Sequence, residues 1–129
     1  MVLSGKDMDI SSRQSSEQRA VLVKALFNAS AQLHLNETQL ATILGIAPIE
    51  ISQLKTHPNV DPSSQLGESA VLLISIAKSL YALTGGDADW MQHFMNTPNQ
   101  LTGGIPAQQI ETIEGLKLVS ISIEYILNQ

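Results

Sequence analysis

The stretch that follows Asp61-Pro62-Ser63-Ser64 and runs to about Leu83 constrains the fold more than any other part of the sequence. The aspartate, proline and serines form a helix start, and Thr84-Gly85-Gly86 ends the segment with residues that break helices. The segment is apolar nearly all round, which is typical of a helix buried on every side. We therefore expect a central helix covered by other elements.

The remaining apolar residues also recur at helical spacing. Leu22, Leu26, Ala29 and Leu33 mark one stripe of a helix over about residues 16–35. Local start and stop signals predict further helices at about 36–44, 48–55, 87–95 and 106–114. The segment from Leu116 to Leu127 fits a helix or a strand equally well, and we choose a helix because no other strand is available to pair with it. The expected class is all-α.

Glu37 to Lys55 has the spacing of a helix-turn-helix unit. Gly45 takes the turn between the helices, and Ala41 is small enough to let the second helix cross close above it. Inward-facing apolar side chains would hold the two helices together; they are Leu40, Leu44, Ile46, Ile51 and Leu54. An ordinary helical hairpin is the alternative.

In a helix-turn-helix, bases are read from the start and outer face of the second helix. A glutamine pairs with adenine and an isoleucine contacts the methyl group of thymine, and one lysine neutralises little phosphate charge. The candidate DNA-binding residues are Gln39, Pro48, Ile49, Ser52, Gln53 and Lys55.

Composition argues against an enzyme. The chain has no cysteine, so it has no disulfide, thiolate zinc site or cysteine nucleophile. Its three histidines, His34, His57 and His93, have no second histidine at i+3 or i+4, so we predict no metal site and no cofactor. We see no export signal and no membrane span, and we expect a soluble cytoplasmic protein with a flexible N-terminus over 1–15.

The formal net charge of the chain is −5, and the acidic residues gather in the second half. An acidic surface repels polyanions and suits a basic partner, although a solvated face without a partner explains the same charge.

The C-terminal half carries an ordered string of residues. Trp90 is followed by Pro98-Asn99, then by Leu101-Thr102-Gly103-Gly104-Ile105-Pro106, and finally by Thr112 and Gly115. This string, together with the helix-turn-helix before it, resembles the Xre/MbcA/ParS antitoxin family over about residues 30–127. Ile110 stands where the family pattern has leucine.

The resemblance implies an Xre-like helix-turn-helix region at 16–60 packed on a small helical toxin-binding domain at 61–129. It implies an antitoxin of a type II toxin–antitoxin system that binds and blocks a cognate toxin, often a RES-type toxin that consumes NAD. It also implies a homodimer and binding to operator DNA. By position, Trp90, Pro98, Asn99, Leu101, Gly103, Pro106, Thr112 and Gly115 would shape the toxin-binding domain.

A structural role explains most of those positions equally well. Trp90 beside Phe94 and Met91 is best interpreted as a core anchor. We therefore place the toxin contacts on polar groups near the loop and the last helix: Gln108, Gln109, Glu124, Tyr125 and Asn128. Two alternatives stay open, a helix-turn-helix transcriptional regulator without a toxin partner and a purely structural interaction module.

Overall fold

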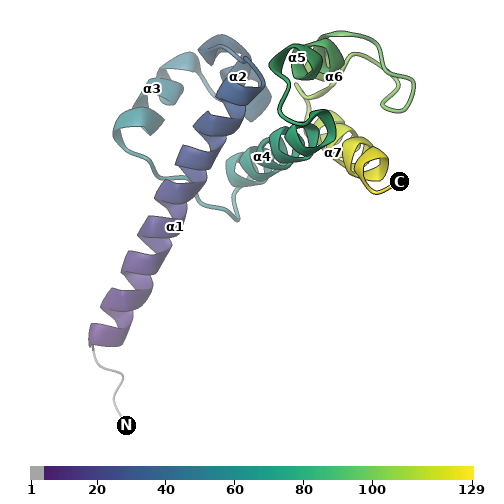
Figure 1. Ribbon diagram of the computed structural model, residues 1–129. Helices are drawn as coiled ribbons and strands as arrows, with labels where there is room; N and C mark the ends of the chain where they lie inside the picture. The colour runs from purple at the N-terminus through teal and green to yellow at the C-terminus, as the bar shows by residue number, and fades with distance from the viewer. Residues whose placement is uncertain (1–4) are drawn as a thin grey trace.

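The computed structural model describes residues 5–129, and the side chains from Ser15 onward (Figure 1). The described chain forms seven helices and contains no strand, which confirms the all-α class. They are α1 (Gly5–Gln32), α2 (Glu37–Leu44), α3 (Pro48–Thr56), α4 (Gln65–Thr84), α5 (Ala88–Asn96), α6 (Pro106–Gln109) and α7 (Ile113–Leu127).

Helix α4 is the central helix, as its composition predicts, but it is not covered on every side, because Val71 and Tyr81 are 48% and 50% exposed. Leu73, Ile76 and Leu80 are fully buried, and α1 and α7 make the largest contacts with α4. By length and composition α4 would also suffice to cross a membrane, but its apolar side chains are those of a core helix held between two others. One core runs from Leu26 in α1 through α4 to Ile123 in α7, so the two halves of the chain share it.

Helix α1 begins earlier than expected. The apolar stripe predicts a start at about Ser16, whereas α1 begins at Gly5. Residues 6–15 contain no glycine or proline, and adding residues to a helix that has already formed costs little free energy. Residues 1–4, which belong to the predicted flexible N-terminus of 1–15, lie outside the described residues.

The helix-turn-helix forms through the caps that the sequence predicts. Asn36 and Gln39 make a reciprocal capping box at the start of α2, with hydrogen bonds of 2.8 and 2.9 Å. Gly45 follows α2 with φ of 70°, a left-handed conformation that glycine adopts without strain. Leu40, Ile51 and Leu54 are buried between the two helices and the body.

The C-terminal helices differ from expectation in one boundary. Helix α6 ends at Gln109, not near Glu114, and α7 begins at Ile113 after three intervening residues. Thr112 causes the break, because its hydroxyl accepts a hydrogen bond of 3.0 Å from the backbone N–H of Gly115 and so caps α7. The last segment is a helix, as predicted.

Candidate partner-binding surfaces

The outer face of α3 carries the predicted base-reading residues. Pro48, Ile49, Ser52 and Gln53 are all exposed, while Ile51 and Leu54 turn inward. Ile49 is the most exposed of the large apolar side chains there, at 65%. The face therefore has the arrangement of a recognition helix, with its short polar side chains pointing outward.

The two other predicted DNA contacts are engaged within the protein. The ammonium of Lys55 pairs with the carboxylate of Glu37 and lies 5.8 Å from the centre of the Phe27 ring. The side chain of Gln39 is held in the capping box of α2. Sequence reasoning missed the ion pair because Glu37 and Lys55 lie 18 residues apart on different helices.

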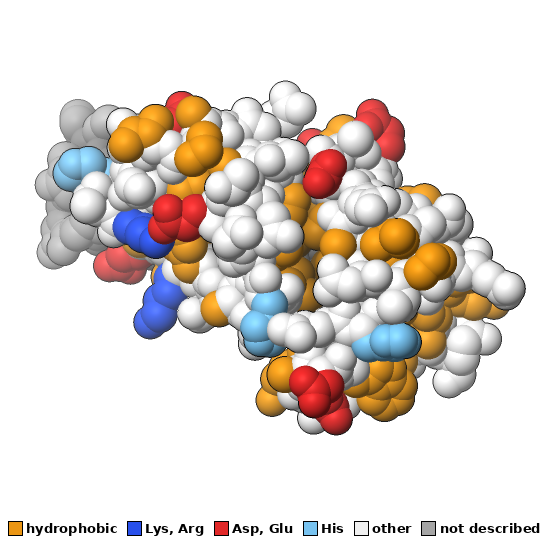
Figure 2. Space-filling model, turned by 90° about the horizontal axis from the view of Figure 1, so that it is seen from above, with side chains coloured by type: hydrophobic (Ala, Val, Ile, Leu, Met, Phe, Trp, Pro, Cys, Tyr) orange, Lys and Arg blue, Asp and Glu red, His pale blue; other side chains and the backbone are white. Residues whose placement is uncertain are grey.

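Positive charge at this end of the molecule is further reduced by a second contact. Arg19 of α1 lies 4.0 Å from the carboxylate of Asp61 and donates a 3.3 Å hydrogen bond to Asn59. Figure 2 shows the molecule from above, and the Lys and Arg side chains visible in that view lie at its left, next to acidic side chains. None is visible over the right half, toward α5 and α6.

Trp90 is not a core anchor, and this prediction is wrong. Its side chain is 55% exposed, whereas Met91 and Met95 of the same helix are buried. Residues four apart share a helix face, so the two methionines define the inward face of α5 and place Trp90 to the side of it. Trp90 and Phe94 have the same spacing as the two methionines, so the sequence alone does not decide which pair faces inward.

The loop after α5 is a tight turn built on Asn99. Its backbone exchanges hydrogen bonds of 2.9 Å with Gly103 and Gly104, and its side-chain oxygen accepts from the amides of Leu101 and Thr102. Gly103 has φ of 79°, which the turn requires. Leu101 is left 45% exposed at the tip.

Gln109 is part of this turn and is not an exposed contact. Its side-chain N–H donates a 2.6 Å hydrogen bond to the carbonyl of Thr102, and its Oε1 is buried. The side chain is half-buried and fastens α6 to the turn. Gln109 is therefore less accessible to a partner than the other four predicted toxin-binding residues.

The structure does not bring the other predicted toxin-binding residues together. Gln108 lies on α6, which directly precedes the N-terminal end of α7. Glu124, Tyr125 and Asn128 lie at the C-terminal end of α7. All four are exposed. At 1.5 Å per residue, the length of α7 separates the two groups by roughly 20 Å, so they belong to two surfaces.

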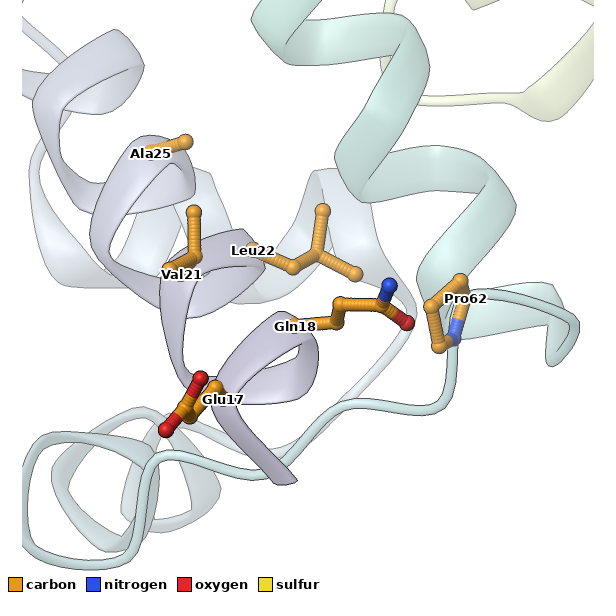
Figure 3. A pocket seen from close by; sticks show the side chains of 6 residues that line it. All are labelled: Glu17, Gln18, Val21, Leu22, Ala25 and Pro62. Carbon is orange, nitrogen blue, oxygen red and sulfur yellow. The ribbon is translucent and has the colours of Figure 1, made fainter. Parts of the chain in front are cut away.

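A shallow groove lies between α1 and the loop before α4, away from these two surfaces (Figure 3). Val21, Leu22 and Ala25 form its apolar wall, and Gln18 reaches across toward Pro62. Glu17 is the one titratable residue among the six that line it, so the groove holds no acid–base pair. Within the described residues no three His, Asp or Glu side chains are placed to hold a metal ion.

Comparison with known protein families assigns both halves of the chain. Residues 12–49 match the antitoxin Xre-like helix-turn-helix domain, and residues 79–121 match the antitoxin Xre/MbcA/ParS C-terminal toxin-binding domain. The chain belongs to the Xre/MbcA/ParS antitoxin family. A search of curated proteins gave no match to the chain.

The antitoxin assignment divides the exposed surface by region. The first match covers α2, the turn at Gly45 and the beginning of α3. The toxin-binding match begins in α4 and covers α5, the Asn99 turn, α6 and much of α7. Four large apolar side chains are exposed within it outside α4: Trp90, Leu101, Leu118 and Ile121.

Proposed function

We propose that this chain is the antitoxin of a type II toxin–antitoxin system and that it neutralises its toxin by direct binding, without catalysis. The observation that carries the proposal is the exposed Trp90 within the residues that match a toxin-binding domain. Tryptophan is among the residues that dominate binding energy at protein interfaces.

We propose that the toxin contacts the end of the molecule formed by α5, the Asn99 turn and α6. Trp90 and Leu101 supply the apolar centre, and Gln108 supplies a polar edge. The hydrogen bond from Gln109 to Thr102 fixes the turn, so the surface is formed before the toxin arrives and little entropy is lost on binding.

The toxin class that the family resemblance favours is the RES type, which consumes NAD. Such a toxin acts on the cytoplasmic NAD pool, so we propose that the antitoxin works in the cytoplasm. On this proposal the chain needs no cofactor of its own, because its task is to cover the toxin.

The test is expression of the reading frame adjacent to this one, alone and together with this chain. The proposal expects growth arrest with a fall in cellular NAD from the neighbour alone, and recovery of both when this chain is present. A neighbour that is harmless alone, or that stays toxic beside this chain, would refute the antitoxin function. Toxicity without a fall in NAD would refute only the RES type.

The exposed face of α3 favours a second candidate function, binding of operator DNA. Ile49, Ser52 and Gln53 stand where a recognition helix reads bases. An antitoxin with this property would repress its own promoter. The alternative to the antitoxin proposal is a transcriptional regulator of the same fold without a toxin, which would bind that DNA while its neighbour is harmless.

A further inference from the structure

Helix α7 carries an apolar stripe that nothing in the described chain covers. The stripe consists of Leu118, Ile121 and Tyr125, which are 45%, 65% and 58% exposed. Their spacing of three and four residues places them on one face of the helix. The opposite face, with Leu116, Val119 and Ile123, is fully buried. Helix α7 is therefore apolar on two sides, and only one of them is used within the chain.

Val71 of α4 extends the stripe sideways. Helix α4 contacts α7 through Glu68, whose carboxylate lies 3.3 Å from the ammonium of Lys117, and through Ser75, which donates a 3.2 Å hydrogen bond to Glu124. Val71 lies between Glu68 and Ser75 on α4 and is 48% exposed, so it borders the stripe.

Two charged groups beside the stripe already have partners within the chain, whereas Glu114, one turn before Leu118 on the same face, is exposed at its end. Lys117 is paired with Glu68, and Glu124 accepts from Ser75. The surface between them therefore offers apolar area without uncompensated charge, which suits an apolar partner better than a charged one.

The order of residues along α7 suits a second copy of the chain as the partner. Leu118 lies three residues before Ile121, and Tyr125 lies four residues after it. A two-fold axis at Ile121 would thus place Leu118 of one copy opposite Tyr125 of the other. An isologous interface requires such self-complementarity, whereas an unrelated partner does not.

The charges follow the same symmetry. Lys117 lies four residues before Ile121, and Glu124 lies three residues after it. Antiparallel pairing of two α7 helices brings Lys117 of each copy near Glu124 of the other, in addition to the partner that each has within its own chain. Parallel pairing would set lysine beside lysine and glutamate beside glutamate, which is unfavourable.

We propose that a second copy of this chain covers the stripe, with the two α7 helices antiparallel and crossing at Ile121. The proposal gives the dimer that the family resemblance implies a specific interface. It assigns Tyr125 and Glu124 to the dimer, and it leaves Trp90 and Leu101 open to the toxin in both copies. It does not depend on the toxin, and a dimer is expected from the purified chain alone.

Light scattering on the purified full chain at about 100 µM tests the proposal. The wild type is expected at twice its mass of 13.9 kDa, and Ile121→Asp at the monomer mass. The matched control is Ile49→Asp, which changes the same residue type at the same exposed fraction of 65% and is expected to remain dimeric. Circular dichroism verifies that both variants are folded.

Cysteine cross-linking provides an independent readout, because the chain has no cysteine of its own. Under mild oxidation Ile121→Cys is expected to form a disulfide-linked dimer, since residues at a two-fold axis bring their Cα atoms within disulfide range. Ile49→Cys is expected to stay monomeric on a denaturing gel. This readout remains available if the aspartate variant fails to fold.

A monomeric wild type would overturn the proposal, as would a folded Ile121→Asp variant that stays dimeric, or cross-linking through Ile49 in place of Ile121. A monomeric wild type whose Ile121→Asp variant loses toxin neutralisation would assign the stripe to the toxin. A dimer that fails to neutralise any toxin would leave this interface intact and refute the antitoxin function.

Discussion

At the residue scale, tight packing against the backbone explains two of the positions that the resemblance assigns to the toxin-binding domain, Thr112 and Gly115. A Cβ added at Gly115 would come within 1.6 Å of the carbonyl oxygen of Gln109. The same residue donates the hydrogen bond that lets Thr112 cap α7. Thr112 and Gly115 therefore set the angle at which α7 leaves α6, which is a structural role.

Replacing Gly115 with alanine is expected to destabilise the protein by about 1–3 kcal/mol, the usual cost of forcing a methyl group into a closed space. Urea denaturation measures the change in the free energy of unfolding. Gly104→Ala is the comparison, with a smaller loss expected, because its added Cβ would meet a side chain, that of Gln109, at 3.1 Å and not the backbone. Equal stability of the Gly115 variant and the wild type would contradict the packing described.

Asp61 gives a pH-dependent prediction. Hydrogen bonds from the backbone N–H and the hydroxyl of Ser63, at 2.9 and 2.7 Å, and then the charge of Arg19 hold the pKa of its carboxyl below the usual value. The ionised form thus favours the folded state, and its contribution is present above the unfolded-state pKa of about 3.9. It is lost as pH falls through the folded-state pKa.

Asp61→Asn is therefore expected to be less stable than the wild type at pH 7, with the difference shrinking as the pH falls below about 4. Urea denaturation of both proteins across that range measures it. A stability difference that stays constant down to pH 2 would show that the charge of Asp61 plays no part.

At the scale of the element, local signals predicted most helix ends. Asn36 with Gln39, Gly45, and Asp87 all act within a few residues of the end that they define, and the structure confirms each. What the sequence left open depends on contacts between distant segments. The exposure of Trp90, the pairing of Lys55 with Glu37 and the burial of Gln109 all follow from how the helices lie against one another.

The pairing of Lys55 has a consequence for the helix-turn-helix. With its charge held by Glu37, this lysine contributes little to phosphate neutralisation, so we expect weak binding of the chain's own upstream DNA. Glu37→Gln is expected to free the lysine for contact with a phosphate. The slope of log K for DNA binding against log salt concentration should then become steeper by about one per subunit.

Gel shifts over a range of salt concentrations measure that slope. Adding Lys55→Ala to the Glu37 variant is the control, and it should return the slope to the wild-type value. An unchanged slope in the Glu37 variant would show that the ion pair does not limit DNA binding. No binding by any variant at low salt would remove the DNA-binding function.

At the scale of the whole molecule, one core joins the helix-turn-helix to the toxin-binding domain. The exposed apolar residues then fall into separate surfaces, on α3, on α7, and at the α5 end. We infer a division of work in which DNA, a second copy and the toxin each have a surface of their own. Such a division would let one chain bind several partners at once.

The most direct test of this account is the affinity of the purified chain for its cognate toxin, measured by calorimetry with Trp90→Ala and Tyr81→Ala. Both variants remove a half-exposed aromatic ring, but Tyr81 borders α1. The account predicts tight binding by the wild type and the Tyr81 variant, and a loss of at least about tenfold for the Trp90 variant at unchanged melting temperature. Undiminished binding by Trp90→Ala, or no binding by the wild type, would contradict it.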